Sequence, residues 1–281
     1  MTNNVRTFFL MTLLTVIFVW VGGQIGGRQG AIIAFLLAAA MNFYAYWFSD
    51  KMVLRQYRAI EMGPGDNSRL YNIVASLIKK ANLPMPKVYI IPDRTPNAFA
   101  TGRNPQHAAV AATEGILDML NDDELAGVMA HELAHVRHRD ILTGTIAATL
   151  AGALTMVAQF SRFGATTRDS GSRQNPLVLI IIMIGAPLAG LIIRSLISRT
   201  REYAADTGGA EISEKPLGLA NALNKLQLGV QKYPMVKANP AHSHLFIVNP
   251  FLGGLQRLFS THPPVEDRIR RLEAMASGTK F

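Results

Sequence analysis

Two histidines four residues apart, His131 and His135, enclose Glu132 in the sequence His131-Glu132-Leu133-Ala134-His135. Positions four apart on an α-helix lie on one face, so both imidazoles can point at a single metal ion. Glu132 is turned by about 100° from His131 and can reach a water molecule beside that ion. The pattern predicts two ligands and the general base of a zinc-dependent hydrolase.

A catalytic zinc ion takes three protein ligands and keeps one position open for water. Glu202 is our prime candidate for the third ligand, because segment 199–206 has helical propensity and places Glu202 and Asp206 on one face. Asp206 would then accept a hydrogen bond from a ligating imidazole and fix its tautomer. Other Glu, Asp and His residues compete for the third position, and a pair of surface acids beside two arginines is the alternative.

Three further histidines have weaker patterns. His138 follows His135 by three residues, and a third ligand there would place Glu132 badly, so we expect a solvated or interfacial side chain. His242 and His244 either border the active-site cleft or belong to a flexible loop.

The composition indicates a membrane protein without thiol chemistry. The 281 residues include no cysteine, which excludes thiolate zinc sites and cysteine nucleophiles. They are 49% hydrophobic and only 17% charged, below the level typical of soluble domains. The net charge of +9 is spread along the chain without interleaved aromatics, which favours basic flanks of membrane spans over nucleic-acid binding.

Two uncharged apolar runs, residues 8–23 and 31–47, predict a transmembrane hairpin within residues 1–50. A cleavable signal peptide is the alternative for the first run, but the second follows almost at once and no cleavage pattern stands out. Basic residues follow the second run, whereas Arg28 alone lies between the runs, so we expect the downstream chain in the cytoplasm.

Residues 141–198 contain two further apolar runs, 141–160 and 177–197, separated by the polar loop 161–175. We expect these runs to be the third and fourth spans of about four transmembrane helices. Three arginines in the loop argue against an external position, so a re-entrant pair is the alternative.

The segments 51–140 and 199–281 have the character of a soluble domain in two parts. Spacing, caps and turn residues predict an α+β fold that is mainly α, with a small sheet. We expect helices over 68–82, from 121 toward 140, and over 199–212, 216–231 and 264–276, and strands over 87–91, 97–101 and 108–112.

In order along the chain stand the hairpin, Asn97-Ala98-Phe99-Ala100-Thr101-Gly102, the HELAH helix, two apolar runs, the segment 202–206 and Thr261-His262-Pro263-Pro264. This series resembles the HtpX-type membrane zinc metalloproteases, a zincin family that also includes the CAAX prenyl endoprotease. The resemblance covers nearly the whole length. It implies a zincin-like catalytic domain with one zinc ion per chain, bound by His131, His135 and Glu202, with Glu132 as base and acid and Asp206 supporting a ligand.

The same resemblance implies roles for two other segments. Asn97, Ala98, Phe99 and Ala100 match an edge strand that binds the substrate backbone by strand addition. The alternative is an ordinary sheet strand with Phe99 in the core. His262 would lie near the zinc and stabilise the oxyanion, although its position before two prolines is equally typical of a helix start.

The motif predicts a membrane-bound endopeptidase with its site at the cytosolic face. The resemblance implies an enzyme of the bacterial inner membrane that cleaves misfolded or unfolded membrane proteins, in quality control under stress. Two alternatives are a specific CAAX-type processing protease and a catalytically silent membrane adaptor. The intact His131, Glu132, His135 and Glu202 argue against the adaptor. The expected partners are protein substrates and the lipid bilayer, without nucleic acid, and the sequence predicts no oligomeric state.

Overall fold

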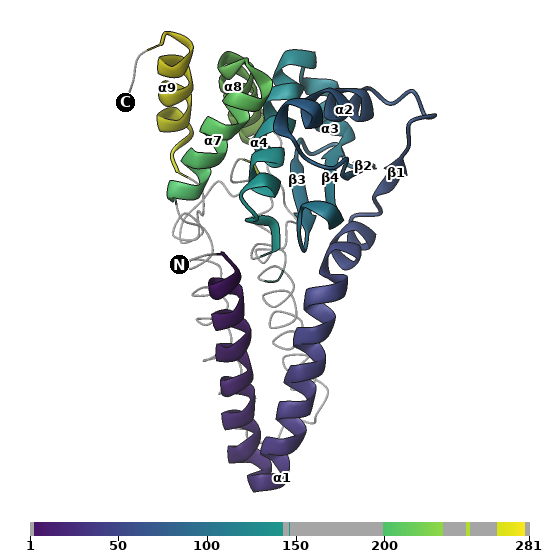
Figure 1. The fold of residues 1–281 in the computed structure, drawn as a ribbon, viewed down its shortest axis with the longest axis vertical. Helices are drawn as coiled ribbons and strands as arrows, with labels where there is room; N and C mark the ends of the chain where they lie inside the picture. Colours follow the sequence, from purple (N-terminus) through teal and green to yellow (C-terminus); the bar gives the residue numbers. More distant parts are fainter. Residues whose placement is uncertain (1–2, 143–145, 147–198, 233–245, 248–262, 279–281) are drawn as a thin grey trace, which may run out of the picture.

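The computed structural model describes residues 3–142, 146, 199–232, 246–247 and 263–278. A long helical hairpin extends from one side of a domain in which helices cover a four-stranded sheet (Figure 1). The predicted third and fourth spans and the loop between them lie outside the described residues, apart from Ile141, Leu142 and Ile146 at the start of the third.

The hairpin is formed by α1 (Asn3–Gln56), which reverses direction at Gly26 and Gly27. Gly27 has φ 57° and ψ −144°, a conformation that only glycine adopts readily. The stretches Thr7–Gln24 and Gly26–Phe48 are each long and apolar enough to cross a membrane, and only 12% and 11% of their residues are buried. Such exposed apolar surface suits lipid rather than water, so the predicted hairpin is present.

The two legs of the hairpin touch closely near the turn. A Cβ atom on Gly22 would lie 2.6 Å from the carbonyl oxygen of Gly30, and one on Gly30 would overlap the carbonyl oxygen of Gly22. Farther from the turn, Asn42 Nδ2 donates hydrogen bonds to Met11 O at 3.2 Å and Thr15 Oγ1 at 2.9 Å. Small residues and polar bridges of this kind hold helices together where no hydrophobic effect operates.

The sheet has the strand order β1-β2-β4-β3, with β2 and β4 parallel and the other neighbours antiparallel. This order leaves β3 at an edge. The three predicted strands agree with the observed ones to within a residue, whereas β1 was not predicted because its run is only three residues long. The bounds are β1 (Ile60–Met62), β2 (Lys87–Ile91), β3 (Ala98–Gly102) and β4 (Ala108–Thr113), with a 3-10 turn η1 (Pro105–His107) before β4.

The two faces of the sheet are covered by different parts of the chain. One face packs with helices α2 (Arg69–Ala81) and α4 (Asp122–Arg137) into the main core, which contains Val110 of β4. The other face meets the end of α1, where Leu54 and Phe99 share a second cluster. The membrane hairpin is therefore packed directly against the sheet that carries the edge strand.

Helix α4 is central to the domain and begins as predicted. Asn121 Oδ1 accepts a hydrogen bond from Glu124 N, and Glu124 Oε2 accepts one from Asn121 N, both at 2.9 Å. These two bonds satisfy donors that a helix start otherwise leaves unpaired. The remaining helices agree with the predicted ranges to within one or two residues, except the unpredicted α3; they are α3 (Glu114–Met119), α7 (Arg199–Ser213), α8 (Pro216–Lys232) and α9 (Val265–Ala276).

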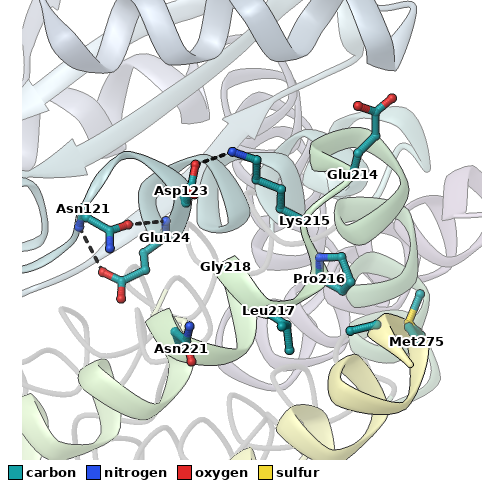
Figure 2. A pocket seen from close by; sticks show the side chains of 11 residues that line it. Asn121, Asp123, Glu124, Glu214, Lys215, Pro216, Leu217, Gly218, Asn221 and Met275 are labelled. Atoms are coloured by element: carbon teal, nitrogen blue, oxygen red, sulfur yellow. Dashed lines mark hydrogen bonds and ion pairs between the residues drawn. The ribbon is translucent and has the colours of Figure 1, made fainter. Parts of the chain in front are cut away.

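A cavity of about 540 Å³ lies beside the start of α4 (Figure 2), and the histidines of that helix are not among the residues that line it. Two of its carboxylates are paired, because Asp123 accepts a hydrogen bond from Lys215 Nζ at 2.5 Å and Glu124 accepts one from Lys225 Nζ at 2.7 Å. These ion pairs fasten the start of α4 to the α7–α8 region. We therefore assign this cavity a structural role and no catalytic one.

Adding a methyl group at Gly30 should separate the legs of the hairpin, because a Cβ atom there overlaps backbone that cannot rotate away. We expect Gly30→Ala to lower the free energy of unfolding by about 1–3 kcal/mol, measured by denaturant unfolding in detergent micelles. Gly26→Ala is the matched control, since its φ of −126° suits alanine and nothing lies within 4 Å of its Cβ position. Equal stability of the two variants would contradict the close contact of the legs.

Candidate metal centre

Helix α4 and the first turn of α7 bring three potential metal ligands together. The Nε2 atoms of His131 and His135 lie 3.2 Å apart. Glu202 Oε2 is 3.8 Å from His131 Nε2, and its Oε1 is 3.6 Å from His135 Nε2. The donor atoms all lie within 4.8 Å of one another, so the three residues could hold one metal ion. The structure thus brings Glu202, the prime candidate for the third ligand, beside the two histidines that share a helix face.

Glu202 reaches the histidines because α7 crosses α4 at a pair of glycines. A Cβ atom on Gly209 would lie 2.8 Å from the backbone nitrogen of His131, and one on Gly208 would lie 3.0 Å from Ala134 Cβ. The two backbones therefore approach as closely as helices can. Glu202, Asp206 and Gly209 follow one another at helical spacing along the buried face of α7.

Each histidine has a carboxylate beside its other ring nitrogen. His131 Nδ1 lies 3.0 Å from Asp206 Oδ1, and His135 Nδ1 lies 3.3 Å from Asp140 Oδ2. An acceptor at Nδ1 holds the proton there and leaves Nε2 free to bind a metal. The position of Asp206 agrees with its predicted supporting role.

Sequence reasoning missed Asp140, which it treated only as the point where the helix region ends. The chain turns sharply after α4, with Arg139 at φ 58° and Asp140 N donating a hydrogen bond to His135 O at 2.9 Å. This turn folds the carboxylate back over the second histidine. An aspartate just beyond the end of a helix that carries a histidine in its last turn is the signal that could have indicated it.

Arg268 is the second residue that sequence reasoning missed, and it is completely buried. Its Nε and Nη2 donate to the two oxygens of Asp206 at 2.9 and 2.7 Å, and its Nη1 donates to Ile247 O at 3.1 Å. Such a two-pronged pair is the strongest arrangement available to arginine. The sequence holds a faint signal, because Arg268 falls on the same face of its helix as the buried Leu272 and the half-buried Val265.

The charges set the protonation of the site. Burial alone would raise the pKa of Asp206, but the charge and hydrogen bonds of Arg268 together with His131 lower that pKa to about 2. Burial would lower the pKa of His135, but its hydrogen bond to Asp140 and the charges of Glu202 and Glu132 raise that pKa to about 9. The surroundings of His135 therefore attract positive charge.

Buried carboxylates gather around the three potential ligands. Glu132, Asp140, Glu202 and Asp206 are four buried carboxylates. They are faced by two guanidinium groups, since Arg268 pairs with Asp206 and Arg201 Nη1 lies 3.5 Å from Asp140 Oδ1. The site is therefore rich in negatively charged groups. Two imidazoles and a carboxylate form a donor set that catalytic zinc sites use.

Glu132 is held beside the group by the edge strand. Its Oε2 accepts a hydrogen bond from Ala100 N at 2.8 Å, and the side chain is 7% exposed. Because β3 pairs with β4 on its other side, this bond leaves from the outer edge of the sheet. The carboxylate predicted as general base therefore lies between the ligand helix and the edge strand.

The other residues predicted to bind substrate all lie in or next to β3, and their side chains serve the fold. Asn97 Oδ1 accepts a hydrogen bond from Ile247 N at 3.4 Å, and Phe99 packs against the Tyr57 ring with centroids 5.8 Å apart. The alternative that placed Phe99 in the core describes its side chain correctly. Ala98 and Ala100 are small and buried, so recognition here would rest on backbone groups.

Of the remaining histidines that the sequence singled out, only His138 lies within the described residues. His138 is exposed at the end of α4, as predicted, and is not part of the group. His242, His244 and His262 lie outside the described residues, so the oxyanion role of His262 remains a prediction.

A membrane hairpin joined to a domain with a helical HELAH sequence and a buried His-His-Glu group defines a membrane-bound metalloprotease. The chain belongs to peptidase family M48, whose sequence profile matches residues 64–276. It is 55% identical to the protease HtpX homolog of Syntrophotalea carbinolica over 278 residues, covering 97% of this chain and 99% of that one. The HtpX homolog of Salinibacter ruber is 53% identical over 277 residues, covering 98% of both chains. The predicted family is therefore confirmed.

A solved structure supports the fold at greater distance. The crystal structure of S. mikatae Ste24p matches with a TM-score of 0.50 at 18% sequence identity. The match covers 96% of this chain but only 62% of that larger one. At this identity the match bears on the fold alone.

Removing Arg268 should leave the Asp206 carboxylate buried without a counter-charge. We expect Arg268→Met to lower the free energy of unfolding by about 3–5 kcal/mol and to weaken metal binding, measured by thermal unfolding and by competition with a chelator. Arg270→Met, two residues on, removes an exposed arginine whose nearest carboxylate is Asp267 at 3.5 Å, and should change stability by less than about 0.5 kcal/mol. Similar losses in both variants would refute the special role of Arg268.

Proposed function

We propose that this protein is a zinc-dependent endopeptidase that cleaves unfolded or misfolded membrane proteins. The observation that carries the proposal is the joining of His131, His135 and Glu202 in one buried group, with Glu132 tied to the outer edge of β3. Ligands, base and substrate-binding strand then lie within one small volume. Such an arrangement suits the hydrolysis of a peptide bond held in extended form.

Zinc held by His131, His135 and Glu202 would supply Lewis acidity toward the scissile carbonyl. Glu132 would accept a proton from the attacking water and then pass it to the departing amide nitrogen. Asp206 and Asp140 would keep the Nδ1 protons in place, so that both Nε2 atoms stay directed at the metal. Arg268 would hold Asp206 in its ionised form throughout the reaction.

Substrate would add to β3 as a further strand. The strand β3 pairs with β4 on one side, and on the other side the N–H group of Ala100 donates to Glu132. Because backbone direction alternates along a strand, the groups of Ala98 should also point outward. Binding by backbone groups selects chains that are extended rather than folded. This selection supports unfolded protein as the substrate class.

The cytosolic face of the bacterial inner membrane is the proposed location. One apolar stretch begins at Thr7 and the other ends at Phe48. Both legs of the hairpin run from the turn toward the domain (Figure 1). Basic residues cluster beyond Phe48, at Lys51, Arg55 and Arg58, which is typical of the cytosolic side. We further propose four spans, a catalytic domain formed by residues 51–140 and 199–281, and a role in quality control under stress.

Two substitutions should separate catalysis from metal binding. Glu132→Gln removes the proposed base but no ligand, so the protein should keep its zinc while cleavage of unfolded casein falls by about 100-fold or more. Glu202→Ala removes a ligand and should lose both zinc and activity. Metal content by mass spectrometry and casein cleavage in detergent provide the two measurements.

Glu211→Ala is the control for the two substitutions. Glu211 lies on α7, as Glu202 does, but it is exposed and pairs with Arg137 at 3.1 Å. It should keep zinc and activity. Wild-type activity in zinc-loaded Glu132→Gln protein would exclude Glu132 as the base. Full zinc content in Glu202→Ala protein would exclude Glu202 as a ligand.

Strand addition predicts an alternating response to backbone methylation of a peptide substrate. A single N-methyl group at a position that donates to β3 should lower kcat/KM about tenfold, because it removes a hydrogen bond and adds a clash. The same group one residue along faces away and should have little effect. A series of peptides methylated in turn near the cleavage site measures this directly. Uniform rates along the series would rule out strand addition.

A further inference from the structure

A second cavity, of about 460 Å³, lies where the membrane hairpin joins the catalytic domain. Its wall is made by both legs of the hairpin, by the turn after β3 and by the turn after α4. The residues that line it are Thr7, Phe8, Met11, Tyr46, Arg103, Asn104, Arg139 and Leu142. The cavity is therefore distinct from the His-His-Glu group, although both border the end of α4.

Two arginines give this cavity its chemical character. The Arg103 guanidinium lies 4.3 Å from the centre of the Trp47 ring, a cation–π contact that holds it at the hairpin. Arg139 lies in the turn after α4 with φ 58°. Within the described ranges, neither guanidinium forms an ion pair with a carboxylate. The cavity thus offers two positive charges without an internal counter-ion.

The depth of the cavity matches that of lipid headgroups. Thr7 is the first residue of one apolar stretch, and Tyr46 lies two residues before the end of the other. The polar and charged groups therefore stand where the hydrocarbon layer gives way to the interface. Phe8 and Met11 add apolar surface within the first stretch. One side of the cavity suits a phosphate and the other suits glycerol and acyl carbons.

We propose that this cavity binds the headgroup of an anionic phospholipid, with Arg103 and Arg139 on the phosphate. Guanidinium groups favour phosphate through charge-assisted, often two-pronged hydrogen bonds. The apolar residues beside them give the lipid an advantage over free phosphate. A bound lipid would connect the hairpin with the turn after β3 and the turn after α4, the two turns that flank the active site.

The test compares lipid binding by full-length protein in detergent, using Glu132→Gln protein so that the chain stays intact. Native mass spectrometry with equal amounts of phosphatidylglycerol and phosphatidylcholine should show one phosphatidylglycerol retained in preference. Arg103→Gln and Arg139→Gln should each weaken this retention roughly tenfold, and the double variant roughly a hundredfold. If protein that keeps both Arg103 and Arg139 retained the two lipids equally, the proposal would be overturned.

Arg55→Gln/Arg58→Gln is the matched control. Both residues are exposed and lie near the end of the hairpin that joins the domain, and neither lines the cavity. Arg58 also has a positive φ of 52°, like Arg139, so the backbone cost of substitution is similar. The control should retain phosphatidylglycerol as before. An equal loss in the control would show general attraction to surface charge and no site.

Inorganic phosphate and glycerol 3-phosphate distinguish the two sources of the anion. Neither should displace phosphatidylglycerol at millimolar concentration, because neither fills the apolar side of the cavity. Displacement by inorganic phosphate would assign the site to a free anion and refute the lipid. Loss of retention in only the double variant, with both single variants unchanged, would also refute it, since each arginine is expected to contact the phosphate.

Discussion

Four carboxylates cannot be buried beside two imidazoles unless cations face them, and this requirement shapes the whole domain. Arg268 brings α9 to the site, Arg201 brings the start of α7, and the turn after α4 brings Asp140. A divalent metal held by His131, His135 and Glu202 would add further positive charge. The helices packed around the site therefore carry charges that neutralise one another. For this reason, metal binding and the stability of the domain should be coupled.

The parts of the site that lie on one helix could be predicted, because helical spacing fixes which side chains share a face. His131, Glu132 and His135 follow from that rule. The rule also places Glu202 and Asp206 on one face of α7, but the resemblance to the HtpX-type proteases was needed to single out Glu202 as the third ligand. The small sheet was visible in its short apolar runs and turn residues. The strand β1 was missed because three residues carry too little pattern to detect.

Arg268 and Asp140 could not be predicted, for two different physical reasons. An arginine in an amphipathic helix is usually solvated, and the partner of Arg268 is 62 residues away, so only the packing of α9 against α7 reveals it. Asp140 depends on a turn whose direction is set by Arg139 in a left-handed conformation. Asn97 shows the same limit, since its bond to Ile247 links segments 150 residues apart.

The contact between Gly209 and the backbone of His131 has a further consequence for how this sequence can vary. Every other amino acid carries a Cβ atom, so any change at this position must move α7 away from α4. Glu202 would move with it and leave the two imidazoles. The packing of the core could adjust to such a shift, whereas the three potential ligands could no longer bind one metal ion. Evolutionary drift at position 209 would therefore be expected to remove catalysis before it removes the fold.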